Sequence, residues 1–162
     1  SDVVTDKAPL NFRWIGLIKL IFPNAIIIHC KRDPLENSWS IYKNDFEGGM
    51  LFSNNAQDIA SYYNIYLNLM SYWKSTFNKD IYDLNYEDLI NNPESKIREI
   101  IFFCGLDWQD ACLEYYKNKK SIKTVSFSQA RKPIYKDSLK GTAKFKNYIQ
   151  DLENALSSSK VR

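Results

Sequence analysis

Histidine and cysteine are scarce in this sequence of 162 residues. The one histidine, His29, excludes zinc sites built from several histidines and disfavours a Ser-His-Asp triad. The three cysteines, Cys30, Cys104 and Cys112, are widely spaced and contain no Cys-x-x-Cys pair. This spacing predicts neither a disulfide framework nor a cysteine metal site, and it favours a reducing compartment. We therefore expect a cytoplasmic protein that needs no metal ion.

Long apolar runs and a strong excess of one charge are also missing. The most apolar stretch, residues 14–30, is interrupted by Lys19, Pro23 and Asn24. It falls short of the roughly 20 apolar residues that span a bilayer. The net charge of +3 is too small to indicate nucleic acid as a partner. The polar start at Ser1 has neither methionine nor a secretory signal, so we interpret it as an internal start or a cut form of a longer protein.

The residues that are present predict an α/β protein. Hydrophobic residues make up 44% and charged residues 25%, as in an average soluble domain. Apolar residues at helical spacing predict several helices. These segments are residues 11–22, 34–47, 57–77, 93–104, 109–118 and 142–157.

Two strands are predicted between these helices. Residues 25–30 form a continuous β-branched run that is typical of a strand buried on both faces of a parallel sheet, and residues 81–86 form the second. The alternation of helices and strands predicts a parallel sheet. Because two strands are too few for a complete domain of this kind, we expect a further piece upstream. We assign residues 1–157 to the domain and residues 158–162 to a frayed tail.

The junction after the first strand is the most informative segment. The strand ends at Lys31-Arg32, and Asp33-Pro34 supplies a helix N-cap and a proline at the first helical position. Ligands of parallel sheets bind beyond the carboxyl ends of the strands, and a helix N-terminus attracts anions. Arg32 adds a planar fork that suits phosphate, and Ser40 adds a hydroxyl donor in the second helical turn. The segment predicts a phosphate clamp. The alternative is a surface arginine paired with a neighbouring carboxylate and an ordinary exposed serine.

This junction resembles the 3′-phosphate-binding signature of sulfotransferases, which use 3′-phosphoadenosine 5′-phosphosulfate (PAPS). The resemblance rests on Arg32, the Asp-Pro that follows it, and Ser40 at the same spacing. Residues 22–28 are similar to the stretch that leads into that signature. Residues 85–93 are similar to the family's Tyr-Glu-Asp-Leu segment followed by Asn-Pro, in which the tyrosine, here Tyr86, lies near the adenine. The closest resemblance is to the bacterial branch related to tyrosylprotein sulfotransferases and often fused to tetratricopeptide repeats, and it covers nearly the whole chain.

The resemblance also implies roles for residues near both ends. Lys7 stands two positions before a proline, where the tyrosylprotein-like relatives have a catalytic lysine. Its ammonium would stabilise negative charge on the bridging oxygen as the sulfuryl group leaves, whereas the alternative is a solvated lysine. Lys140 and Gly141 partly resemble the pattern that closes over the 3′-phosphate, although leucine precedes them where arginine is usual. Ser138 resembles a serine that helps to hold the 5′ side. The alternative for this region is a basic loop.

The resemblance implies a fold and an activity. The fold is a P-loop-NTPase-like, three-layer parallel sheet with flanking helices. Here the N-terminal strand and its Gly-rich phosphosulfate loop are missing, since the five glycines are scattered. The activity is transfer of a sulfuryl group from PAPS, as co-substrate, to a hydroxyl-bearing acceptor: a peptide tyrosine, a saccharide or a small alcohol. We expect the chain alone to be inactive.

Two other functions stay open from the residues themselves. A P-loop kinase or NTPase fragment would share the broad fold, but it needs a Walker A loop and a magnesium-binding carboxylate, and the sequence has neither pattern. A non-enzymatic interaction domain is suggested by an aromatic stripe on the long helix, for which the alternative is buried core. The stripe consists of Tyr62, Tyr63, Tyr66 and Trp73.

Overall fold

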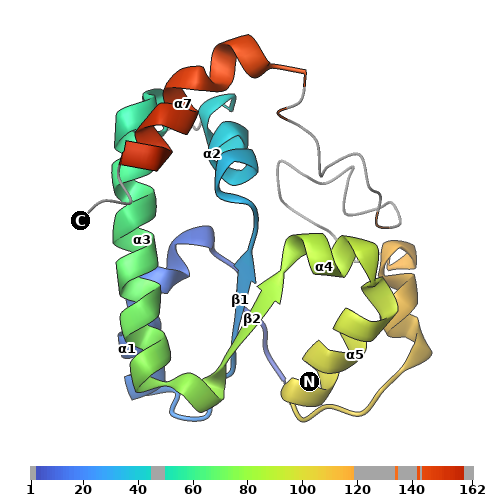
Figure 1. Ribbon diagram of the computed structural model, residues 1–162. Coiled ribbons are helices and arrows are strands. Elements are labelled where there is room, and N and C mark those ends of the chain that lie inside the picture. The colour runs from blue at the N-terminus through green and yellow to red at the C-terminus, as the bar shows by residue number, and fades with distance from the viewer. Residues whose placement is uncertain (1–2, 45–49, 119–133, 135–141, 143, 159–162) are drawn as a thin grey trace.

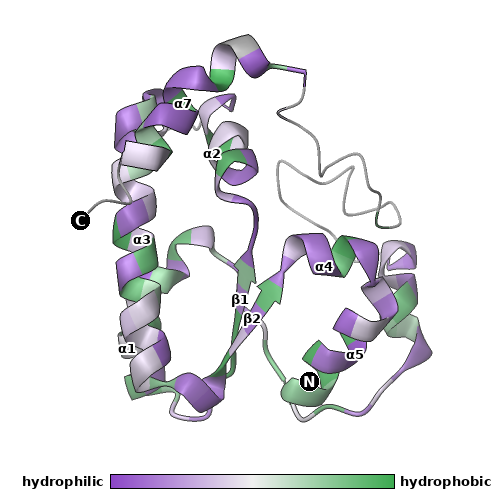
Figure 2. Ribbon diagram, in the orientation of Figure 1, coloured by the Kyte–Doolittle hydropathy of each residue, from purple (hydrophilic) through white to green (hydrophobic). Residues whose placement is uncertain are grey.

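Two short parallel strands stand at the centre of the molecule (Figure 1). Strand β1 (Ile27–Lys31) pairs with β2 (Ile81–Asn85), with Ile27 opposite Ile81 and Lys31 opposite Asn85. The computed structural model describes residues 3–44, 50–118, 134, 142 and 144–158. Both strands lie where the sequence predicts them, to within two residues, and they run parallel as expected. The chain turns hydrophilic beyond the carboxyl end of β1 (Figure 2).

The first helical segment consists of two parts. The 3-10 helix η1 (Pro9–Trp14) begins at its proline and leads into α1 (Ile15–Ile21). The single helix predicted over residues 11–22 is therefore divided, because residues 11–14 belong to the 3-10 helix and the α-helix starts at Ile15. The buried ammonium of Lys19 donates hydrogen bonds to the carbonyl oxygens of Pro23 and Ala25, and it lies 2.9 Å from an Asp80 carboxylate oxygen. These contacts fix the turn between α1 and β1.

Helix α2 (Pro34–Tyr42) begins at Asp33, whose side chain accepts a hydrogen bond of 2.9 Å from the backbone nitrogen of Glu36. The predicted N-cap and the proline at the first helical position are confirmed. The described helix ends at Tyr42, before the predicted end near residue 47, and residues 45–49 lie outside the described residues. The 3-10 helix η2 (Leu51–Asn54) then leads into α3 (Ala56–Thr76).

The aromatic side chains of α3 pack inward rather than forming an open stripe. The Tyr62 ring stacks on Phe52 with centroids 3.9 Å apart, and the Tyr66 ring meets Phe12 edge-on at 5.2 Å. The Trp73 indole nitrogen donates a hydrogen bond of 2.8 Å to the Phe12 carbonyl oxygen. These contacts favour the buried-core interpretation of the stripe and weaken the case for a free binding surface.

Short helical segments make up the rest of the described chain. The 3-10 helix η3 (Asn78–Asp80) precedes β2, and α4 (Tyr86–Asn91) and α5 (Pro93–Phe103) follow it. The 3-10 helix η4 (Asp110–Lys117) and α7 (Lys146–Ser158) complete the order. The sequence did not predict α4. Gly105, at φ 65°, ends α5 as expected, because glycine adopts this left-handed backbone without strain.

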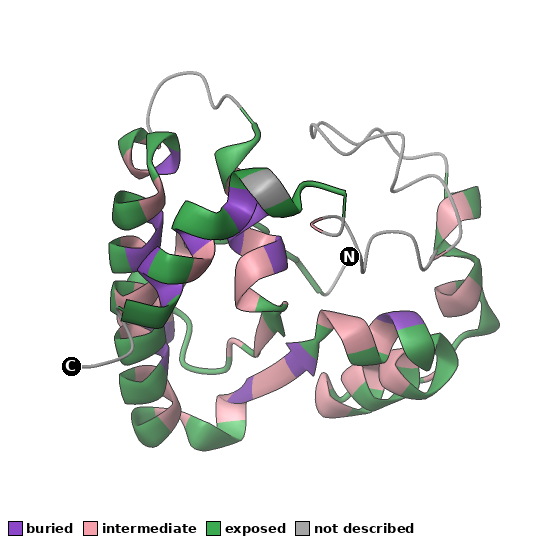
Figure 3. Cartoon of the chain, turned by 45° about the horizontal axis from the view of Figure 1, so that its top comes forward, coloured by how far each residue is buried: buried purple, intermediate pink, exposed green. Residues whose placement is uncertain are grey.

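The main core lies between α2, α3 and α7, where most buried residues gather (Figure 3). It consists of Trp39, Ile59, Ala60, Ile149, Leu152, Ala155 and Leu156. A smaller cluster, formed by Ile15, Met70 and Ile81, joins α1 and α3 to the sheet. Tyr148, on α7 (Lys146–Ser158), is exposed.

The architecture is mixed α/β and mostly helical, with one small parallel sheet. In Figure 1, α1 and α3 lie on one side of the strands, α4 and α5 on the other, and α2 and α7 beyond the carboxyl end of β1. The described residues form two strands and therefore not the full three-layer sheet that the resemblance implies. Across those same residues, every helix is too short or too polar to cross a bilayer.

Candidate functional site

The carboxyl ends of the two strands bring Arg32 and Tyr86 together. Arg32 follows β1 directly and Tyr86 follows β2, so the parallel pairing places both residues at one edge of the sheet. The guanidinium carbon of Arg32 lies 5.2 Å from the centre of the Tyr86 ring, within the range of a cation–π contact. The Asp33 backbone nitrogen also donates a hydrogen bond of 2.8 Å to a Glu87 carboxylate oxygen. These contacts tie the start of α2 to the start of α4.

The buried carboxylate of Glu36 joins this edge to the C-terminal part of the chain. One oxygen accepts hydrogen bonds from the Thr142 backbone nitrogen at 3.0 Å and from the Thr142 hydroxyl at 2.7 Å. The other oxygen lies 3.5 Å from an Arg32 terminal nitrogen, at the limit of a hydrogen bond. Glu36 therefore anchors Thr142 firmly and holds Arg32 loosely.

The structure describes two of the other predicted site residues, Ser40 and Lys7. Ser40 is half-buried in α2, where its carbonyl oxygen accepts a hydrogen bond from Asn44. Lys7 is exposed in the extended segment before η1, and no described residue is a hydrogen-bond partner of its ammonium. Ser138, Lys140 and Gly141 lie outside the described residues. Thr142, the neighbour of Gly141, is nonetheless fixed beside Glu36.

A polar network crosses the middle of the sheet, and the sequence analysis missed it. His29 Nδ1 donates a hydrogen bond of 2.7 Å to an Asp83 carboxylate oxygen. Since a carboxylate only accepts, the neutral ring carries its proton on Nδ1, and Nε2 accepts from the Tyr66 hydroxyl at 2.5 Å. Lys74 donates to the other Asp83 oxygen, and the Lys31 ammonium lies 3.4 Å from it. The network joins β1, β2 and α3.

Burial and charge set the protonation states in this network. Burial lowers the pKa of the His29 imidazole, although the hydrogen bond to Asp83 acts in the opposite direction. Burial alone would raise the pKa of the Asp83 carboxyl, but hydrogen bonds from Lys74 and His29 lower it to about 2. Burial also raises the pKa of the Tyr66 hydroxyl. At neutral pH the network therefore holds a neutral histidine, a neutral tyrosine and an ionised aspartate.

Sequence offsets carry a signal that could have revealed this network. His29 stands three residues before Arg32, and Asp83 stands three residues before Tyr86. If the arginine and the tyrosine meet at one edge of a parallel pair, equal offsets place the histidine opposite the aspartate. The observed register pairs these two residues. In the described part of the chain, no group of three or more His, Cys, Asp or Glu side chains could hold a metal ion.

Comparison with known proteins identifies the family. A protein of Aquifex aeolicus (strain VF5), described as an uncharacterized protein, is 40% identical over 149 residues. The match covers 90% of this chain and 20% of that protein, so the chain spans about a fifth of the length of this relative. A model of the sulfotransferase family matches residues 1–110, which include β1, Arg32, β2 and Tyr86. The chain therefore belongs to the sulfotransferase family.

Proposed function

We propose that the chain forms the 3′-phosphate side of a PAPS site and takes part in sulfuryl transfer to a hydroxyl-bearing acceptor. The observation that carries the proposal is the position of Arg32. It stands at the carboxyl end of β1, against the Tyr86 ring and beside Glu36. In parallel sheets this edge is where ligands bind, and a planar guanidinium suits a phosphate group.

We assign each of these candidate residues a role in binding the donor. Arg32 pairs with the 3′-phosphate near the N-terminus of α2, and Ser40 adds a hydroxyl from the same helix. The contact between Arg32 and Glu36 is long, at 3.5 Å, so this carboxylate competes only weakly with a phosphate for the guanidinium. Tyr86 supplies a flat surface for the adenine. Lys140 and Gly141 complete the phosphate side and Ser138 the 5′ side, and the anchored Thr142 supports this assignment.

The reaction proposed is a displacement at sulfur. The acceptor oxygen forms a bond to the sulfur as the bond between sulfur and the bridging oxygen of PAPS breaks. The acceptor proton passes to a base, and adenosine 3′,5′-bisphosphate (PAP) leaves. Lys7, placed at the bridging oxygen, stabilises the negative charge that develops there. As in phosphoryl transfer, positioning and electrostatics supply most of the rate increase.

Calorimetry with two nucleotides tests the donor site. Arg32→Ala should weaken PAP binding by about 2–4 kcal/mol, the range for losing a desolvated charged hydrogen-bond partner. Binding of AMP, which lacks the 3′-phosphate, should change little. Arg98→Ala is the matched control, because Arg98 also lies over an aromatic ring, 3.8 Å from the centre of Trp108, but on α5. Equal losses for PAP and AMP, or equal effects of the two variants, would remove Arg32 from this role.

A further inference from the structure

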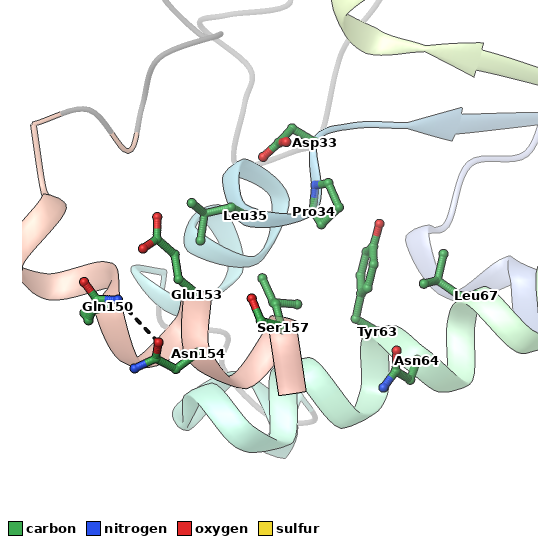
Figure 4. A pocket seen from close by; sticks show the side chains of 11 residues that line it. Asp33, Pro34, Leu35, Tyr63, Asn64, Leu67, Gln150, Glu153, Asn154 and Ser157 are labelled. Atoms are coloured by element: carbon green, nitrogen blue, oxygen red, sulfur yellow. Dashed lines mark hydrogen bonds between the residues drawn. The ribbon is translucent and has the colours of Figure 1, made fainter. Parts of the chain in front are cut away.

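A pocket of about 480 Å³ opens between the start of α2, the middle of α3 and α7 (Figure 4). This volume lies within the roughly 300–1,000 Å³ of pockets that bind small organic molecules. Residues from three separate segments line it, so its shape depends on the packing of the main core directly beneath. The polar side chains of the lining are Asp33, Tyr63, Asn64, Gln150, Glu153 and Asn154, together with one serine.

The charge of the lining separates this pocket from the donor site. It contains the carboxylates of Asp33 and Glu153, and none of the described residues that line it is cationic. The lining therefore disfavours phosphate, sulfate and carboxylate groups, because none of its described side chains offsets the two negative charges. Arg32, which follows β1 on the proposed donor side, is not part of the lining. The pocket must serve a ligand other than the anionic donor.

The polar groups suit a ligand with several hydroxyls. Carboxylates accept hydrogen bonds, and the amides of Gln150 and Asn154 both donate and accept, so neighbouring hydroxyls can be bound in pairs. Gln150 and Asn154 stand one helical turn apart on α7 and lie within 3.4 Å of each other. In Figure 4, Glu153 projects from the same helix beside Leu35.

The remaining lining supplies an apolar wall. Tyr63 extends from α3 alongside Pro34 (Figure 4), and leucine side chains flank them. Burial and, to a lesser degree, the negative charge of Asp33 raise the pKa of the Tyr63 hydroxyl. The Asp33 carboxylate and the Tyr63 side chain are therefore close enough to interact. A wall of ring and aliphatic carbon opposite amides and carboxylates matches a sugar ring, which has C–H faces and hydroxyl edges.

We propose that this pocket binds an uncharged saccharide, at a site separate from the proposed donor site. Acidic peptides and uronic or sulfated sugars do not fit, since the lining repels anions.

Titration of the 162-residue chain, followed by NMR, tests the pocket. The probes are the uncharged methyl β-glycosides of glucose, galactose and N-acetylglucosamine, with methyl β-glucuronide as the anionic control. At least one uncharged glycoside should bind with a Kd on the order of 1 mM and shift the side-chain amide signals of Asn64 and Asn154. Methyl β-glucuronide should bind at least about 10-fold more weakly.

Two variants and a matched control locate the binding. Glu153→Gln should weaken glycoside binding about 5-fold, as expected when a hydrogen bond to a charged acceptor becomes a neutral one. Glu153→Lys should let methyl β-glucuronide bind. Asp151→Asn removes the same charge from an exposed position of the same helix outside the lining, and it should change binding less than 2-fold.

The outcomes separate this inference from the donor site. Failure of all three uncharged glycosides to bind would overturn it, as would equal effects of Glu153→Gln and Asp151→Asn. PAP binding by the same protein is measured in parallel. If PAP binds and no glycoside does, the saccharide pocket is wrong and the donor site stands. If a glycoside binds and PAP does not, the saccharide pocket stands and the proposed donor site is wrong.

Discussion

The contact between Glu36 and Thr142 joins residues 106 positions apart, and its energy can be measured. Thr142→Val removes the hydroxyl that donates 2.7 Å to the carboxylate while it keeps the shape of the side chain. Glu36 then retains the Thr142 backbone nitrogen at 3.0 Å and the distant Arg32. The variant therefore tests one hydrogen bond to a charged acceptor, with little change in packing.

The structure sets the size of the effect. A hydrogen bond to a charged group contributes about 1.5–3 kcal/mol, and the Glu36 side chain is only 10% exposed, so solvent screens the interaction weakly. We expect Thr142→Val to lower the free energy of unfolding by about 1.5–2.5 kcal/mol. Glu36→Gln should cost a similar amount. The double variant should show a coupling energy of about 1–2 kcal/mol, because either substitution alone weakens the same contact.

Urea unfolding followed by tryptophan fluorescence measures these energies. Thr76→Val is the matched control, since its hydroxyl donates to the Tyr72 carbonyl oxygen at an exposed helix end. That substitution should stay within about 0.5 kcal/mol of the unchanged protein. A coupling energy below about 0.3 kcal/mol between Glu36 and Thr142 would refute the reasoning. Thr142→Val should also weaken PAP binding several-fold, because Thr142 directly follows Lys140 and Gly141, to which we assign the 3′-phosphate.

The remaining predictions concern pH, helix capping and catalysis. Because the pKa of Asp83 is lowered from 3.8 to about 2, its ionised form stabilises the folded chain by about 1–2 kcal/mol above pH 3.8. This stabilisation is lost as the pH falls toward 2, and Asp83→Asn should remove the step from the pH dependence of Tm. The lowered pKa of His29 reduces stability at a higher pH, because below pH 6.5 the unfolded chain binds a proton that the folded chain does not yet bind. His29→Gln should flatten this part of the pH dependence of Tm. Asp33→Ala should cost about 1 kcal/mol in urea unfolding, whereas Asp33→Asn, which still caps α2, should cost a few tenths. Within a protein that has sulfotransferase activity, Lys7→Ala should lower kcat and leave the Kd of PAP within about 2-fold.

Local chemistry explains which parts of the fold the sequence predicted. The start of α2 depends on Asp33-Pro34, whose capping oxygen and fixed φ act within one turn, so the prediction was correct. Helix α4 was missed because its six residues, Tyr86–Asn91, are too few to show an apolar period. The 3-10 geometry of η1 is a similar case, since apolar spacing does not distinguish it from the first turn of an α-helix.

The sequence predicted candidate site residues only where a family motif was recognisable. The resemblance implied that Arg32 and Tyr86 serve one nucleotide, and the structure places their side chains in contact. The alternative, an arginine paired with a neighbouring carboxylate, is also present in the structure as the contact between Arg32 and Glu36. The bond between Glu36 and Thr142 left no local trace, because contacts across 106 positions follow from tertiary packing.

The buried network also explains how so small a sheet sets the site. Two strands of five residues offer few hydrogen bonds to define their register. A slip of one residue would turn His29 to the opposite face from Asp83, and a slip of two would place it opposite Ile81 or Asn85. Either slip would deprive the Asp83 carboxylate of its hydrogen bond from the imidazole. Because Arg32 and Tyr86 each stand three residues farther along, the same pairing that satisfies Asp83 brings the guanidinium to the ring.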